Sequence, residues 1–169
     1  HTCGSLHTEE LDAQESSDIE ARLKKELNLP VMHDDQHGTA IISGAALLNA
    51  LEITGKDISK AKIIVNGAGA SAISCTKIYV SLGANKENIF MYDSKGLIHG
   101  DRTNLDGKKS DFINSTVPAN TTLAQILDGA DVFIGLSRGD VLDQEMIKPM
   151  ATDPIIFAMA NPTPEISYQ

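Results

Sequence analysis

Residues 62–72, KIIVNGAGASA, decide the fold, because a β-branched run stands directly before a glycine-rich turn and the start of a helix. Lys62 to Asn66 predicts a short buried strand. The turn after it fits G-x-G-x-x-A: Gly67 permits the tight bend, Gly69 lets the backbone approach a pyrophosphate, and Ala72 allows close packing of helix on strand. The predicted cofactor-binding residues of this turn are Gly67, Ala68, Gly69, Ala70, Ser71 and Ala72.

The N–H groups of residues 68–71 are expected to face the phosphates, helped by the helix dipole. A second strand, residues 88–93, ends in Asp93, which stands 21 residues after Ala72. An acid at this place commonly binds the hydroxyls of the adenosine ribose and favours NAD over NADP. Ser94 and Lys95 follow it and could serve a 2′-phosphate, so the sequence leaves the choice open. A tight βα turn without a ligand is the alternative.

The rest of the chain extends the alternation of strands and helices in both directions. Short apolar strands are predicted at 131–136 and 154–160, helices at 122–128 and 143–150, and a loop with one weak helical segment at 94–120. Upstream, we expect a helix over 17–28 capped by Ser17, a strand over 30–33, and a helix over 39–53 buried on most sides. Apolar strands separated by helices indicate a parallel sheet covered on both faces. The predicted fold class is α/β, a doubly wound (Rossmann-type), mostly parallel sheet.

Composition excludes several classes of protein. The 169 residues carry 14 Lys and Arg against 23 Asp and Glu, a net charge of −9, with 4% aromatic residues and no Trp. Such a chain repels phosphate backbones and anionic lipid and lacks platforms for base stacking, so no nucleic-acid or membrane partner is expected. No stretch approaches the roughly 20 apolar residues of a membrane span. Two cysteines do not suggest a disulfide framework, and a cytoplasmic location is expected.

A polar cluster, HDDQHGT at 33–39, is the second candidate site. Asp34 and Asp35 stand at a predicted strand end, where carboxylate oxygens could bind Mg²⁺ or Mn²⁺. A solvated turn, with one of these acids capping the following helix, is the alternative from spacing alone. The alternation of His33, Asp35 and His37 leaves a zinc or iron site conceivable.

Several stretches, quoted in chain order, resemble the NAD-binding domain of bacterial malic enzymes: VMHDDQHGTAIISGAALLNAL, VNGAGASAISC, YDSKG, LDGADVFIGLS and FAMANPTPEI. The resemblance covers roughly residues 15–166. It implies oxidative decarboxylation of malate to pyruvate with NAD or NADP and a divalent cation, Mg²⁺ or Mn²⁺. It divides the chain into residues 1–18, a divergent segment, and residues 19–169, the NAD(P)-binding domain, truncated relative to the family at both ends.

The resemblance also assigns roles to single residues. Asp35 inherits the role of metal ligand, and Asp34 beside it is the candidate catalytic carboxylate. The other two ligands of the family fall on Glu9 and Glu10, where Glu10 replaces the family's Asp; a generic acidic terminus is the alternative. Asn161, in MANPTPEI, inherits contact with substrate and nicotinamide, against a turn-forming role before Pro162.

The Tyr acid and Lys base of malic enzymes precede the region that this chain represents, so the chain alone is expected to turn over malate very weakly. The longer parent is expected to be a homo-oligomer. Three alternatives stay open: a non-catalytic dinucleotide-binding module, a malolactic-type enzyme, and another Rossmann dehydrogenase.

Overall fold

The computed structural model describes residues 4–8, 13–103, 105 and 107–167. Its centre is a five-stranded sheet of order β5-β4-β3-β6-β7, in which only β5 runs antiparallel to its neighbour. The strands are β3 (Ile63–Asn66), β4 (Ile89–Asp93), β5 (Gly96–Leu97), β6 (Val132–Gly135) and β7 (Ile155–Ala158). The predicted α/β fold with a mostly parallel, doubly wound sheet is confirmed.

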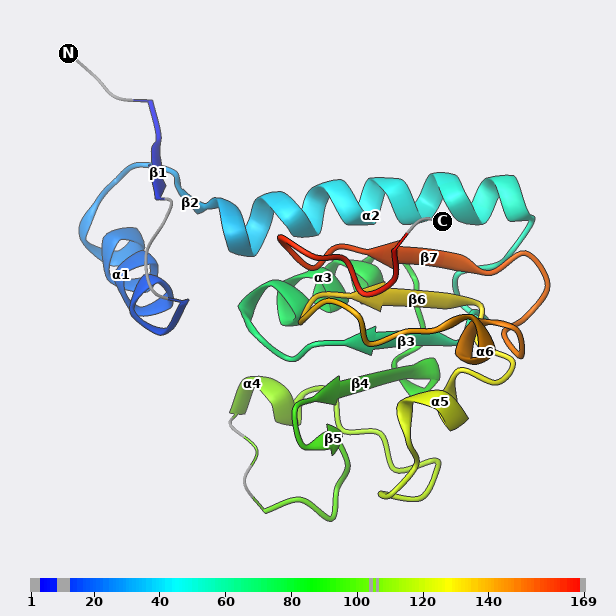
Figure 1. Cartoon of the computed structure of the whole chain (residues 1–169). Helices are drawn as coiled ribbons and strands as arrows, with labels where there is room; N and C mark the ends of the chain where they lie inside the picture. Colours follow the sequence, from blue (N-terminus) through cyan, green and yellow to red (C-terminus); the bar gives the residue numbers. More distant parts are fainter. Residues whose placement is uncertain (1–3, 9–12, 104, 106, 168–169) are drawn as a thin grey trace.

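Helices cover both faces of this sheet (Figure 1). Two long ones, α2 (Asp34–Thr54) and α3 (Ala70–Ser81), pack together on one side. The 3-10 turn η1 (Lys86–Asn88) precedes β4, and α4 (Gly107–Ser110) follows β5. The short segments α5 (Leu123–Ile126) and α6 (Gln144–Ile147) precede and follow β6. From β3 the chain builds the sheet in one direction through β4 and β5, and then returns to add β6 and β7 on the other side of β3. The strand order therefore reverses between β3 and β6.

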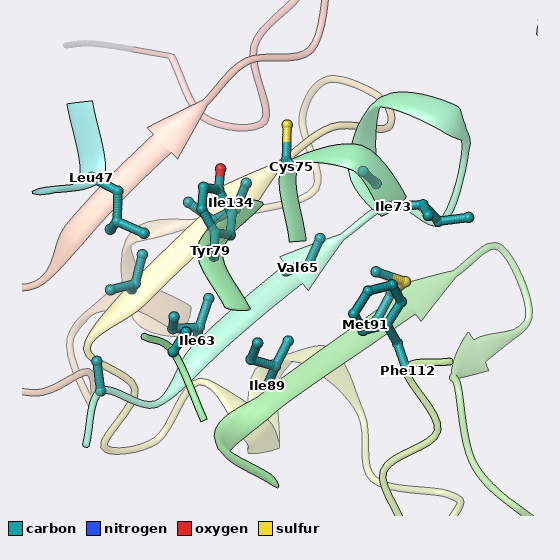
Figure 2. Close-up of a cluster of buried hydrophobic side chains, with 14 of the residues drawn as sticks. Leu47, Ile63, Val65, Ile73, Cys75, Tyr79, Ile89, Met91, Phe112 and Ile134 are labelled. Atoms are coloured by element: carbon teal, nitrogen blue, oxygen red, sulfur yellow. The ribbon is translucent and has the colours of Figure 1, made fainter. Parts of the chain in front are cut away.

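Successive residues of each strand point to opposite faces, and both faces are buried. Ile63, Val65 and Ile134 belong to the core beneath α2 and α3, where Figure 2 shows them with Met91 and Tyr79. The intervening strand residues Ile64, Phe90 and Phe133 pack on the other face into a second core, together with Ile126, Leu127 and Leu142. Continuous apolar strands therefore follow from burial on two sides.

The N-terminal part forms a small separate unit beyond the beginning of α2 (Figure 1). Strand β1 (Leu6–Thr8) pairs in parallel with β2 (Val31–His33), and α1 (Ala13–Glu26) connects them. The predicted start of this helix at Ser17 is wrong. The helix begins four residues earlier, because Ala13, Gln14 and Glu15 are good helix formers and continue the helix upstream.

Two expectations for α2 are also wrong. The cluster 34–38 is not a loop: it forms the first turn of α2, with His33 in an extended conformation as N-cap and no side-chain cap. Two acids in a first turn complement the helix dipole, so the helix starts without a cap. Nor is α2 buried on most sides, because Ile42 and Ile53 are 72% and 86% exposed. No described helix is long and apolar enough to cross a membrane.

Candidate nucleotide-binding site

A cleft of about 990 Å³ opens at the carboxyl ends of β3, β4 and β6, where the strand order reverses. Open α/β sheets bind ligands at this kind of switch point. Its lining comes from three stretches of chain, Asn66–Gly69, Tyr92–Ser94 and Leu136–Val141, and from the single residues Lys109, Leu123 and Met146. The cleft therefore joins the glycine-rich turn to the end of β4, as the sequence predicts.

Gly67 has the geometry that the turn requires. Its φ is +139°, which disfavours any side chain, and an added Cβ would lie 2.6 Å from the carbonyl oxygen of Leu136. Gly69 is the N-cap of α3 and has no Cβ neighbour within 4 Å, so the backbone is open there. Ala72 is fully buried, in keeping with its predicted role in packing. The start of α3 thus offers backbone N–H groups to an anion in the cleft.

Asp93 is held by cations that the sequence did not identify. Arg102 donates two hydrogen bonds to its carboxylate, Lys109 lies 3.7 Å away, and the backbone N–H of Lys95 donates at 2.8 Å. Burial alone would raise the pKa of Asp93, but the hydrogen bonds from Arg102 and from the Lys95 backbone outweigh it and lower the pKa below its ordinary value of 3.8. Asp93 is therefore an ionised carboxylate at the rim of the cleft whose charge is balanced by Arg102 and Lys109.

The possibility that Lys95 serves a 2′-phosphate stays a prediction, and the cations beside Asp93 are other residues. The side chain of Lys95 is exposed and does not line the cleft, whereas Lys109 does. Arg102 reaches Asp93 from a loop nine residues further along the chain. A β-turn at 93–96 directs the side chain of Lys95 outwards while its N–H binds Asp93. Only the basic character of residues 102–109 hinted at the cations that the fold brings here.

Asn161 lies outside the lining of this cleft, in the exposed segment after β7. The peptide bond from Asn161 to Pro162 is cis. This segment is bonded to the loop after β6: the N–H of Asp140 donates to Pro164, and that of Leu142 to Glu165. Asn161 is therefore carried by a segment that adjoins the cleft, and no contact of its side chain assigns it a role.

Asp34 lines a different cleft, between the first turns of α2 and the strand β7, together with Gly38, Ile42, Phe157 and Met159. A Cβ at position 38 would overlap the carboxylate of Asp34, so glycine there leaves room for that carboxylate. His33 is the N-cap of α2 and His37 lies in its first turn, but the side chain of Asp35 lies outside the described part, so the alternating His33-Asp35-His37 site stays untested.

The side chain of His37, in α2, contacts Glu20 in α1. Its Nε2 lies 2.9 Å from Oε1 of Glu20, which is 5% exposed and also pairs with Lys24 at 2.8 Å. Burial raises the pKa of Glu20, but the bonds from Lys24 and His37 outweigh it and lower the pKa. His33 contrasts with this, because its ring is buried and neither nitrogen has a hydrogen-bond partner among the described residues.

The predicted metal ligands are not brought together in the part of the chain that the structure describes. Glu9 and Glu10 lie outside the described residues, and the side chain of Asp35 is not described either. Among the described side chains, no group of three or more metal-ligating residues is present. The metal site therefore stays a prediction, and the structure supplies no ligand set for it.

Neither described tyrosine is placed to donate a proton to a substrate. Tyr79 is fully buried and its hydroxyl donates to Ser43, and burial raises its pKa. Tyr92 donates to the carbonyl of Thr121, and burial raises its pKa to about 12. Both hydroxyls serve the packing of the fold, in agreement with the absence of a family motif around them.

Comparison with known proteins decides the family. A family model described as "Malic enzyme, NAD binding domain" matches residues 36–167. This chain belongs to the malic enzyme NAD-binding domain family. The match begins in the HDDQHGTA stretch and ends in the segment after β7, so it contains the whole lining of the cleft at the strand reversal, and Asn161. The resemblance drawn from the sequence is confirmed.

Relatives of this malic enzyme domain are longer proteins. The NAD-dependent malic enzyme of Rhizobium meliloti is 48% identical over 166 residues, which are 98% of this chain and 21% of that protein. The NADP-dependent malic enzyme of Halomonas elongata is 47% identical over 163 residues, 96% of this chain and 38% of that protein. The chain therefore spans about a fifth to two fifths of these relatives.

Solved structures of malic enzymes superpose closely on this domain. The Entamoeba histolytica enzyme gives a TM-score of 0.90 at 37% identity, over 97% of this chain and 35% of that one. The NAD-dependent enzyme of Thermotoga maritima gives 0.88 at 40% identity, over 97% and 44%. Relatives named for NAD and for NADP are similarly close in sequence, so similarity alone does not select the cofactor.

Proposed function

We propose that this chain is the nucleotide-binding domain of an enzyme that oxidises malate and decarboxylates it to pyruvate and CO₂, with NAD or NADP as hydride acceptor. The observation that carries the proposal is the cleft at the strand reversal, built on Gly67 and Asp93, in a chain of the malic enzyme family. When bound, the dinucleotide would accept the hydride from C2 of malate. The chain's own contribution is to bind and orient that dinucleotide.

Each part of the cleft has a distinct task. The backbone N–H groups from Ala68 to Ser71, at the start of α3, bind the pyrophosphate. Asp93, at the end of β4, faces the adenosine ribose. The loop after β6 encloses the other half of the dinucleotide, towards Asn161, whose amide contacts nicotinamide and substrate in this proposal. Residues 19–169 are the proposed extent of the domain.

Metal binding is a second part of the proposal and rests on the family resemblance. Asp35, with Glu9 and Glu10, would hold Mg²⁺ or Mn²⁺, and Asp34 would be the adjacent catalytic carboxylate. A bound divalent ion would act as a Lewis acid on the carbonyl of the oxidised substrate. The buried ring of His33, next to Asp34, has no hydrogen-bond partner in the part of the chain that the structure describes, which supports a start of α2 that adjoins further polar groups.

The parent enzyme supplies what this chain lacks. The general acid and base are expected from other parts of a longer protein, which we propose is a homo-oligomer. We therefore expect the 169-residue chain to bind nucleotide and to turn over malate very slowly, because each missing proton-transfer group costs about 10²-fold or more.

A fluorescence titration of the purified chain with NADH and NADPH tests the proposal. Saturable binding of either nucleotide, together with negligible malate-dependent reduction of NAD or NADP, is the expected result. A folded chain that binds neither would refute the proposed function. Repeating the titration with Mn²⁺ tests the metal proposal separately from nucleotide binding. A nucleotide affinity that Mn²⁺ does not change would contradict coupling between the nucleotide cleft and the proposed metal site.

A further inference from the structure

Glu165 is a fully buried carboxylate without a cation beside it. It is 0% exposed, and among the described residues no Lys, Arg or His lies within ion-pair distance of it. Its Oε2 accepts a hydrogen bond from the N–H of Ala160 at 3.0 Å, and its Oε1 accepts one from the N–H of Ser137 at 3.3 Å. Burying an ionised group is costly unless it is hydrogen-bonded, so these two donors are the compensation that the fold provides.

The two donors belong to two different loops. Ser137 lies after β6, and Ala160 lies after β7, next to Asn161. The backbone joins the same loops: the N–H groups of Val141 and Leu142 both donate to the carbonyl of Glu165, at 3.0 and 2.9 Å. The side chain of Glu165 therefore bonds both loops, and its backbone carbonyl adds two further bonds to the loop after β6.

Glycines make room for this contact. A Cβ at Gly135, the last residue of β6, would overlap the Glu165 carboxylate. A Cβ at Gly139 would lie 2.6 Å from the side chain of Thr163. The loops are thus in direct contact over their length, and glycine is required at both places for them to meet.

Both loops lie on one half of the nucleotide cleft. Strand β4 with Asp93 is on one side of β3, and β6 and β7 are on the other. In sheets of this order, the adenosine half of a dinucleotide lies over the first side and the nicotinamide half over the second. The loop held by Glu165 contributes Leu136 to Val141 to the lining, and Glu165 forms hydrogen bonds with Ser137, Val141, Leu142 and Ala160.

We propose that Glu165 is a positioning residue for the nicotinamide half of the site: its carboxylate holds the loop after β6 against the segment that carries Asn161. The inference rests on the proposed function and adds a residue that the family resemblance did not assign. Glu165→Gln is the matched variant. It keeps the shape, but its NH₂ group replaces one acceptor and meets a backbone N–H, so one of the two loops loses its bond.

The experiment compares wild type, Glu165→Gln and the control Glu145→Gln as full 169-residue chains. Glu145 is a 79% exposed acid on α6 whose ion pair is with Lys148. Affinities are measured for NADH and for ADP, which represents the adenosine half alone. An unsatisfied buried donor predicts an NADH affinity about tenfold weaker in Glu165→Gln, with ADP affinity unchanged. The control leaves both affinities as in wild type.

Amide hydrogen exchange adds a readout that needs no ligand. At least one of the two amides, that of Ser137 or that of Ala160, should exchange faster in Glu165→Gln, while amides of β3 and β4 stay protected. If Glu165→Gln does not fold, Gly135→Ala perturbs the same contact from the opposite side and should weaken NADH in the same selective way.

Other results would contradict either the positioning role of Glu165 or the proposed function. A folded variant with wild-type NADH affinity, or with NADH and ADP weakened equally, contradicts the positioning role. Unchanged exchange at Ser137 and Ala160 contradicts it without any nucleotide. A folded wild-type chain that binds neither NADH nor ADP refutes the proposed function instead, and it refutes the nicotinamide role of Glu165 with it.

Discussion

Arg102 donates two hydrogen bonds to the carboxylate of Asp93, from Nη1 to Oδ1 at 2.9 Å and from Nη2 to Oδ2 at 2.8 Å. Both side chains are mostly buried, at 16% and 11% exposed. Paired bonds of this kind are among the strongest that an arginine makes with a carboxylate. The carboxylate at the end of β4 thus carries its own counter-charge at the place where the adenosine ribose is expected.

Replacing Asp93 should shift the choice of nucleotide. In Asp93→Ser, Arg102 loses its carboxylate partner and becomes available to a 2′-phosphate, and the repulsion between carboxylate and phosphate disappears. The ratio of NADPH to NADH affinity should rise about tenfold, the size of one charge-assisted hydrogen bond. Fluorescence titrations of both nucleotides measure it. Asp101→Ser, which removes a 78% exposed acid from the same loop, should leave the ratio unchanged; an equal shift in that control would contradict this account.

The same ion pair predicts a dependence of stability on pH. The pKa of Asp93 is lowered in the folded protein from its ordinary value of 3.8, so its contribution is fully present above that value. The contribution is lost as the pH falls through the lowered, folded pKa, because the unfolded chain then binds more protons. Urea unfolding should show wild type more stable than Asp93→Asn near neutral pH, with the difference shrinking below pH 3.8. A difference independent of pH would refute the assignment.

Gly67 should be intolerant of any side chain. Gly67→Ala forces a residue to adopt φ +139° and to approach the Leu136 carbonyl, so we expect a loss of about 1–3 kcal/mol in stability and strongly reduced NADH binding. Gly55→Ala is the matched control, because Gly55 has φ +67°, an open surrounding and no place in the cleft. It should lose stability and keep its affinity for NADH. Normal binding by Gly67→Ala would exclude the turn as the phosphate site.

Cys75 should be inert towards thiol reagents in the native protein. It is fully buried between α2 and α3, and Ser43 donates a hydrogen bond to its sulfur at 3.4 Å. Burial raises the pKa of its thiol, which lowers the fraction of reactive thiolate. In a Cys3→Ser background, labelling with iodoacetamide should be very slow in buffer and rapid in urea. Fast labelling without denaturant would show that the two helices separate readily.

The sequence predicts the sheet better than it predicts the helix surfaces. β3 and β6 match their predicted strands to within a residue at each end, because buried parallel strands are continuous apolar runs that flanking turns delimit. The helix over 34–54 was placed five residues too late and was expected to be buried. An apolar helix looks the same in sequence whether its outer face is covered or, as at Ile42 and Ile53, exposed.

The candidate site was predictable where it depends on local sequence. Gly67 and Asp93 follow strands at fixed spacing and meet in one cleft. Arg102 and Glu165 act through contacts that only the folded chain creates, so no spacing rule identifies them. The loop from Leu136 to Val141 was accessible to reasoning, since it follows a parallel strand and such loops line the crevice.

The most direct test of the central claim is to map bound NADH on the ¹⁵N-labelled chain by amide chemical shifts. The account predicts saturable shifts at Gly67 to Ala70, at Asp93, and in the loop after β6, with β1 and α1 unaffected. Shifts confined to the cleft between α2 and β7, or no shifts in a folded chain at saturating NADH, would contradict the assignment of this cleft as the nucleotide site.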